Sequence, residues 1–138
     1  MYKSFYLEIL TPDRDFFRGE VESLIIRTPG GKMGILYQTM PMVTTIAAGL
    51  MRFSQKGVWK EAFASEGFIE VRAERVVILL QSAEWPYEIN ISKVNDEIDA
   101  AEATLRKAQS LREYKIAKAQ LARQFAKLKV RGGRGGLD

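Results

Sequence analysis

The strongest constraint on the fold is a change of pattern at Trp85-Pro86-Tyr87. Before this point, short runs of β-branched and aromatic residues alternate with Gly, Pro and Asp, as in strands joined by tight turns. After it, the chain from Asn90 to Arg131 contains neither Gly nor Pro, which favours helix. The sequence therefore predicts a two-part α+β protein, with a β-rich first part and a helical second part.

The first part, residues 1–85, predicts an antiparallel β-sandwich or barrel of about 8–10 strands. Phe5, Leu7 and Ile9 lie at every second position, as in a half-buried strand. A β-branched run over residues 21–28 is followed by further apolar stretches over residues 35–36, 42–46, 49–53, 58–64, 68–71 and 76–80. Because no helix-length segment separates these stretches, a parallel α/β sheet is excluded.

The second part predicts a helical hairpin over residues 86–131, followed by a flexible tail over residues 132–138. Two apolar stripes with steps of three and four residues support it. The first comprises Val94, Ile98, Ala101, Leu105 and Ala108, and the second comprises Tyr114, Ala117, Leu121, Phe125 and Leu128. Either Asn90 or Ser92 can cap the first helix. The break near Gln109 is weak, so one long helix and a two-helix hairpin both fit the pattern.

Charge is unevenly distributed along the chain. The formal net charge is +4, but residues 1–111 carry 13 basic and 15 acidic residues. Residues 112–138 carry 8 basic and 2 acidic residues. A near-neutral body with a basic end predicts an acidic partner for that end, although a solvated basic helix without a dedicated partner fits equally well.

Composition removes most catalytic chemistry. The chain has no His and no Cys, which excludes a Ser-His-Asp triad, a reactive thiol and an ordinary zinc site. The paired carboxylates Asp13/Asp15 and Glu20/Glu22 lack metal-loop spacing and are interpreted as solvated charges. We expect no catalytic residue, no metal site and no required cofactor. The longest apolar run, Val76 to Leu80, is far shorter than the ~20 residues of a membrane-spanning helix, so we expect a soluble protein.

Two segments resemble functional motifs only weakly. The segment Gly30 to Leu36 superficially resembles a phosphate-binding loop, but it lacks the Lys-Ser/Thr end and precedes no helix. We interpret it as a glycine-rich turn between strands. The segment Arg131 to Gly136 resembles an Arg-Gly tail, so a free-standing nucleic-acid-binding module built on the basic hairpin is the alternative function. It is disfavoured because the body has no basic strand rich in aromatic residues.

Several motifs are similar to one family over most of the chain. These are Gly31-Lys32-Met33-Gly34-Ile35-Leu36, Pro41-Met42-Val43-Thr44, Ser65-Glu66-Gly67-Phe68-Ile69-Glu70-Val71 and the last apolar run followed by Ala83-Glu84. Together with a β-rich body and a helical hairpin, they resemble the epsilon subunit of the F-type ATP synthase, called delta in mitochondria. The resemblance extends from Phe5 through Leu128.

The resemblance implies a non-catalytic central-stalk subunit. Its sandwich would bind the gamma subunit and rest on the c-ring. The resemblance places it on the cytoplasmic side of the bacterial plasma membrane, attached only through the complex. The expected gamma and c-ring contact loop comprises Gly31, Lys32, Met33, Gly34, Tyr37, Gln38, Thr39 and Met40. This chain departs from the family there, because Lys32 replaces a Glu and Tyr37-Gln38-Thr39 replaces Pro-Gly-His.

The same resemblance implies regulation by the hairpin, which in the family extends towards the alpha and beta subunits and impedes ATP hydrolysis. The expected inhibitory basic face, which would meet an acidic segment of beta, comprises Arg112, Lys115, Lys118, Arg123 and Lys127. Some relatives also bind ATP in the folded hairpin. The matching residues, which imply at most weak ATP binding, are Ile89, Asn90, Lys93, Arg123 and Lys127. Here Asn90 replaces an Asp and Lys93 replaces an Arg, which removes a bidentate guanidinium.

Overall fold

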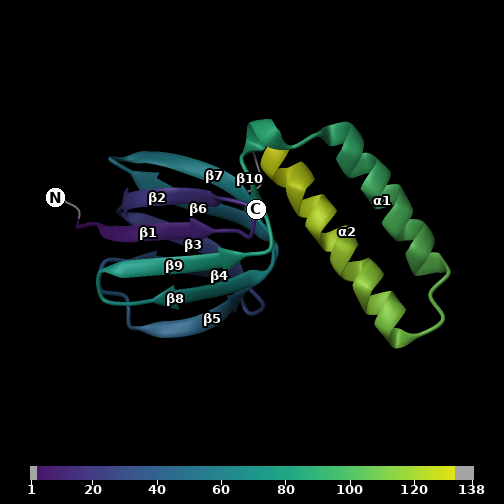
Figure 1. Cartoon of the computed structure of the whole chain (residues 1–138), viewed down its shortest axis with the longest axis horizontal. Coiled ribbons are helices and arrows are strands. Elements are labelled where there is room, and N and C mark those ends of the chain that lie inside the picture. Colours follow the sequence, from purple (N-terminus) through teal and green to yellow (C-terminus); the bar gives the residue numbers. More distant parts are fainter. Residues whose placement is uncertain (1–2, 133–138) are drawn as a thin grey trace.

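The computed structural model describes residues 3–132 and consists of a β-sandwich joined to a helical hairpin (Figure 1). The strands are β1 (Phe5–Leu10), β2 (Asp15–Val21), β3 (Ser23–Thr28), β4 (Gly31–Leu36), β5 (Met42–Ile46), β6 (Gly49–Gln55), β7 (Val58–Ala64), β8 (Gly67–Val71), β9 (Arg75–Leu80) and β10 (Ala83–Glu84). A short 3-10 turn, η1 (Pro86–Glu88), leads into α1 (Ile91–Arg106) and α2 (Leu111–Arg131). The flexible tail was predicted over residues 132–138, and of these only Gly132 lies within the described range.

The strands form two sheets that pack face to face. Their orders are β2-β1-β9-β8-β5 and β10-β7-β6-β3-β4, each five-stranded. Inward side chains such as Leu7, Phe53 and Ile78 are 0% exposed and belong to one core cluster. The predicted α+β class, with a β-sandwich followed by a helical hairpin, is therefore confirmed.

One pair of strands departs from the expected antiparallel arrangement. β1 runs parallel to β9, with Leu7 opposite Val76 and Ile9 opposite Ile78. Every other strand pair in the described part of the chain is antiparallel. Parallel pairing requires a long connection, and the intervening strands β2 to β8 supply one without any helix.

Three local features of the sandwich differ from the interpretation of the sequence. The segment Gly30 to Leu36, expected as a glycine-rich turn between strands, contains the edge strand β4, and the turn is confined to Pro29-Gly30. β2 was missed because Gly19 and a β-bulge opposite Ile9/Leu10 obscure its alternation. Glu22, expected to be a solvated charge, accepts hydrogen bonds from the backbone N–H groups of the tight turn at residues 56–57.

The helical part is a hairpin and not one long helix. Asn90 Oδ1 accepts a hydrogen bond from Lys93 N and caps α1, while Ser110 Oγ accepts one from Glu113 N and caps α2. The Glu113 carboxylate in turn accepts a hydrogen bond from the N–H of Gln109, the residue before that cap, which further stabilises the break between the helices. Of the residues in the two predicted stripes, Val94, Ile98 and Ala101 of α1 and Ala117 of α2 are buried.

The base of the hairpin packs on the sandwich, and its tip projects away from it (Figure 1). A second apolar cluster joins Phe63 of β7 to Ile89, Val94, Ile98 and Val130. In contrast, nearly all of α2 from residue 111 to 120 is exposed. The hairpin is therefore held at one end only.

No helix among residues 3–132 combines the length and the apolar character needed to cross a membrane.

Candidate functional site

The predicted contact loop is divided between two places in the fold. Gly31, Lys32, Met33 and Gly34 lie in β4, where Gly31 is opposite Thr28 at the hairpin end of the sheet. The other four residues follow Leu36, whose partner is Ser23 at the opposite end. Because a strand rises ~3.3 Å per residue, Gly31 and Leu36 at the two ends of β4 are roughly 16 Å apart. The two groups do not form one loop.

The loop from Tyr37 to Met40 is a defined turn at the end of the sandwich far from the hairpin. Gln38 has a positive φ of 62°, which reverses the chain. Thr39 stabilises the reversal, since its Oγ1 donates to Leu36 O and accepts from Leu36 N, both at 2.8 Å. Met40 is left 79% exposed. The turn therefore presents an apolar side chain on a rigid support, with Thr39 in a structural role.

A second exposed surface was missed by the sequence reasoning. On the outer face of the first sheet, Leu10 lies opposite Leu79, and Leu79 lies opposite Phe68. Phe68 and Leu79 are 57% and 51% exposed, and Val43 on the neighbouring strand β5 is 69% exposed. We call Leu10, Val43, Phe68 and Leu79 the apolar face. A contiguous exposed apolar surface of this kind marks an interaction site.

The sequence carried a signal for this face. Residues 76–80 form an unbroken apolar run, whereas a strand with one solvated face alternates apolar and polar residues. The unbroken run indicates that both faces of β9 are covered in the working protein. On the same face, the buried carboxylate of Glu8 pairs with Arg75 and, at 3.2 Å, with Arg18, which gives the apolar face a charged border.

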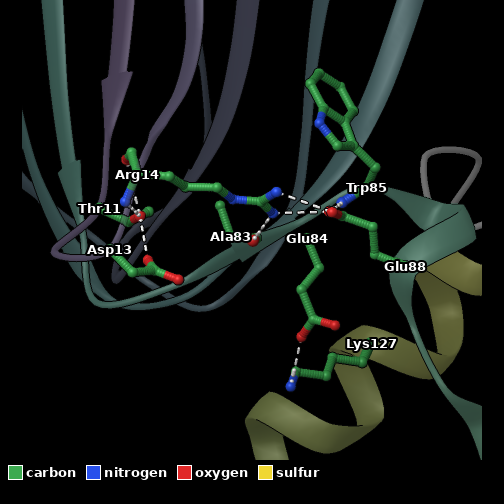
Figure 2. A network of polar contacts seen from close by, with 8 residues as sticks. All are labelled: Thr11, Asp13, Arg14, Ala83, Glu84, Trp85, Glu88 and Lys127. Atoms are coloured by element: carbon green, nitrogen blue, oxygen red, sulfur yellow. Dashed lines mark hydrogen bonds and ion pairs between the residues drawn. The ribbon is translucent and has the colours of Figure 1, made fainter.

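The connection between sandwich and hairpin is fixed by one arginine (Figure 2). The Arg14 guanidinium donates to both carboxylate oxygens of Glu88, at 2.8 and 2.7 Å, and to Ala83 O at 3.0 Å. Glu88 also accepts from Trp85 N at 2.8 Å. The hydrogen bonds from Arg14 lower the pKa of Glu88, and those to Glu88 raise the pKa of Arg14. Trp85 itself stacks on Phe16 with ring centroids 4.3 Å apart.

The predicted basic face is divided by the position of the hairpin. Arg112, Lys115 and Lys118 are exposed near the tip. Lys127 instead pairs with Glu84 of β10 at 2.7 Å, and Arg123 lies 3.6 Å from Glu66. The last two cations therefore do not point outward, because the C-terminal half of α2 lies on the sandwich and meets its carboxylates.

The residues predicted to bind ATP are only partly brought together. Asn90, Lys93 and Lys127 line a pocket of about 470 Å³ at the hairpin junction. Ile89 is 4% exposed in the apolar cluster and Arg123 is turned towards Glu66, so neither lines this pocket. Three carboxylates, Glu84, Glu88 and Glu97, share the pocket with the two lysines.

Comparison with known proteins agrees with this arrangement. The sequence model of the ATP synthase delta/epsilon chain β-sandwich domain matches residues 4–86. The ATP synthase epsilon chain of Caldanaerobacter subterraneus subsp. tengcongensis is 46% identical over 94% of this chain and 95% of its own length. The corresponding chain of Ruminiclostridium cellulolyticum is 42% identical over 91% of this chain and 93% of its own.

Solved structures show the same fold. A chain in the Euglena gracilis mitochondrial ATP synthase, in an assembly of OSCP, F1 and c-ring, superposes with a TM-score of 0.77 at 21% identity. The match covers 89% of this chain and 78% of that chain. A chain from the central stalk and c-ring of the Tetrahymena thermophila enzyme gives a TM-score of 0.68 at 12% identity, covering 94% and 98%. From the sandwich model and the curated relatives, the chain belongs to the ATP synthase epsilon chain family.

Proposed function

We propose that this chain is a non-catalytic subunit of the central stalk of a bacterial F-type ATP synthase, held at the cytoplasmic side of the plasma membrane only through the complex. Membership of the epsilon chain family makes it part of that rotary enzyme. The observation that carries the proposal is the apolar face, which a stalk partner would cover. The subunit would transmit rotation through packed surfaces, without bond chemistry of its own.

The gamma subunit is the proposed partner of the apolar face. Phe68 and Leu79 are directly opposite each other and more than half exposed, so covering them would remove a large apolar area from water. The pairs that Glu8 makes with Arg18 and Arg75 would form the polar rim of the interface. The c-ring is the proposed partner of the turn from Tyr37 to Met40, where Met40 extends from the end of the sandwich opposite the hairpin.

Binding to gamma tests this assignment directly. Phe68→Glu introduces a charge at the centre of the apolar face and should weaken binding to purified gamma by about tenfold or more. Val58→Glu is the matched control, because Val58 is 62% exposed but lies in the other sheet. Equal binding by both variants would refute the proposed interface.

The hairpin is the proposed regulatory element. Arg112, Lys115 and Lys118 are already exposed at its tip, where they could meet an acidic segment of beta. Arg123 and Lys127 would join them only after leaving Glu66 and Glu84. Individual exposed ion pairs contribute only ~0–1 kcal/mol, so the cations would have to act together. Removing residues 91–138 should raise membrane ATP hydrolysis, and unchanged hydrolysis would sink the regulatory proposal.

Weak ATP binding at the hairpin junction is a further proposal from the family resemblance. It is supported by Asn90, Lys93 and Lys127, which share one pocket. A triphosphate bound there would have to compete with Glu84 for Lys127. Calorimetric titration of the full chain with ATP tests it, with Lys93→Gln as the variant expected to weaken binding.

A further inference from the structure

The edges of the two sheets are not equally protected. An edge strand presents unpaired backbone N–H and C=O groups, with which a strand of another chain can pair. The edge strands are β2 and β5 in one sheet and β10 and β4 in the other. Within residues 3–132, three of these four edges carry a feature that opposes such pairing, and β5 is the exception.

Each of the other three edges is protected in its own way. β2 carries three exposed charged side chains and a β-bulge, both of which hinder the approach of another strand. β10 has only two residues, and Ala83 O already accepts a hydrogen bond from Arg14. On β4, the Thr39 hydroxyl occupies both backbone groups of Leu36.

The hydrogen bonds between β8 and β9 show which way the backbone groups of β8 point. Just beyond the two ends of β8, Arg72 N donates to Arg75 O at 2.8 Å and Gln81 N donates to Glu66 O at 3.1 Å. Bonded and non-bonded pairs alternate along an antiparallel ladder, and the register of β8 on β9 is continuous. The even-numbered residues of β8 therefore bond to β9, and its odd-numbered residues bond to β5.

The same alternation defines the free backbone groups of β5. The residues opposite the odd-numbered positions of β8 are Met42, Thr44 and Ile46. The N–H and C=O groups of Val43 and Thr45 consequently point away from β8, towards the open edge. No backbone partner for these two residues on that side is found within residues 3–132.

The open edge is flat and uncharged, and it borders the apolar face. β5 reads Met-Val-Thr-Thr-Ile, so it contains no charged residue, Gly or Pro and has three β-branched residues at its centre. The side chains of Val43 and Thr45 are exposed. Val43 belongs to the apolar face, and Thr45 lies directly opposite Phe68. In Figure 1, β5 is the lower border of its sheet, with β8 on one side only.

Both ends of this edge are closed, which limits the length of a partner strand. At one end Pro41 has no N–H to donate. At the other end Ala47 N, the next outward group, donates to Arg27 O of β3 at 2.9 Å. The five residues of β5 span roughly 17 Å at ~3.3 Å per residue, which suits a strand of about five residues.

We propose that an extended segment of the gamma subunit pairs with β5 as an added strand of its sheet. The inference rests on the proposed function, in which gamma covers the apolar face. The added strand would exchange hydrogen bonds with Val43 and Thr45 and place an apolar side chain beside Val43. Because apolar burial is non-directional, these backbone bonds would fix the register of gamma on the sandwich.

Gamma fits this edge better than a second copy of the chain does. A second copy paired edge to edge would extend the sheet and leave Phe68 and Leu79 of both copies exposed. A partner that covers the apolar face already lies beside Val43, so it can bury the face and pair with the edge at once.

Replacing Thr45 with proline tests the backbone pairing. Thr45→Pro removes an N–H that faces outward, so the free chain loses no ladder hydrogen bond. Binding to purified gamma should weaken by about three- to tenfold. Thr45→Val keeps the N–H and the β-branched shape, and it should bind within about twofold of the unaltered chain. An unchanged Tm confirms that both variants are folded.

Amide hydrogen exchange tests the same pairing without any substitution. The Thr44 N–H lies in the ladder opposite Ile69 and should be protected with or without gamma. The Thr45 N–H should exchange freely in the isolated chain and become protected when gamma is added. Protection of Thr45 that does not change on addition of gamma would contradict the pairing.

The outcomes separate this inference from the stalk assignment. If Phe68→Glu weakens binding to gamma but Thr45→Pro binds as Thr45→Val does, the added strand is refuted and the stalk assignment stands. If the isolated chain self-associates and Thr45→Pro abolishes only that association, the edge belongs to a second copy and the proposal is wrong. If the unaltered chain does not bind gamma, both proposals fail.

Discussion

The Lys127 ammonium lies 2.7 Å from the Glu84 carboxylate, which ties the last turns of the hairpin to the last strand of the sandwich. Both side chains are about three-quarters buried, at 21% and 26% exposed. Arg123 and Glu66 add a longer contact at 3.6 Å, and Arg123 Nε has no hydrogen-bond partner within residues 3–132. The first pair is therefore the stronger electrostatic link between the two parts.

Breaking this pair should loosen the hairpin. Lys127→Gln is expected to cost ~0.5–1 kcal/mol of docking stability, which corresponds to about a two- to fivefold loss of amide exchange protection in residues 121–130. Lys118→Gln, which removes a cation from the exposed half of the same helix, should leave that protection unchanged. If both variants exchange like the unaltered chain, the pair does not hold the hairpin.

Acid should destabilise the connection between the two parts. The pKa of Glu88 is lowered in the folded chain, first by its hydrogen bonds with Arg14, below an ordinary value of 4.5. The group therefore adds stability above that ordinary pKa, and the stability is lost as the pH falls through the folded value. Measured Tm should drop as pH is lowered below about 4.5.

The variant Glu88→Gln makes this prediction specific. It should have a lower Tm at pH 7 and a flatter Tm profile in acid than the unaltered chain. Asp13 titrates in the same direction, because a hydrogen bond from Thr11 lowers its pKa, so some acid dependence will persist in the variant. If the Tm of the variant depended on acid pH in the same way as that of the unaltered chain, the Arg14–Glu88 pair would not contribute to the pH dependence of stability.

Two glycines in the sandwich should respond differently to alanine. A Cβ on Gly67 would lie 1.9 Å from Leu79 O, a backbone atom that cannot move aside cheaply. Gly67→Ala should therefore lower the free energy of unfolding, measured in urea, by ~1–3 kcal/mol or more. A Cβ on Gly34 would meet nothing within 4 Å, so Gly34→Ala should change stability by no more than about 0.5 kcal/mol. Similar losses in both variants would contradict the packing described for β8 and β9.

Local patterns in the sequence predicted local structure well. The stripe of Val94, Ile98 and Ala101 became the buried face of α1, and Asn90 became its cap. These features depend on residues three or four positions apart, so their spacing is visible in the sequence.

Non-local structure could not be read in the same way. The parallel pairing of Leu7 with Val76 and the bond from Arg14 to Glu88 join segments about 70 residues apart, and no period in the sequence records them. The division of the basic face could not be predicted for the same reason. The sequence shows that Lys127 is charged, but only the docked helix places it against Glu84.

The central claim is that the apolar face around Phe68 contacts the gamma subunit of the rotary enzyme. Because the chain contains no Cys, a single introduced cysteine gives an unambiguous attachment point for a cross-linker. The comparison uses two chains, Phe68→Cys and Val58→Cys. Each carries a short photoactivatable group on its cysteine and is assembled into the complete synthase. The account predicts a cross-link to gamma from position 68 and none from position 58. A cross-link from position 58 alone would place gamma on the other sheet and contradict the assignment.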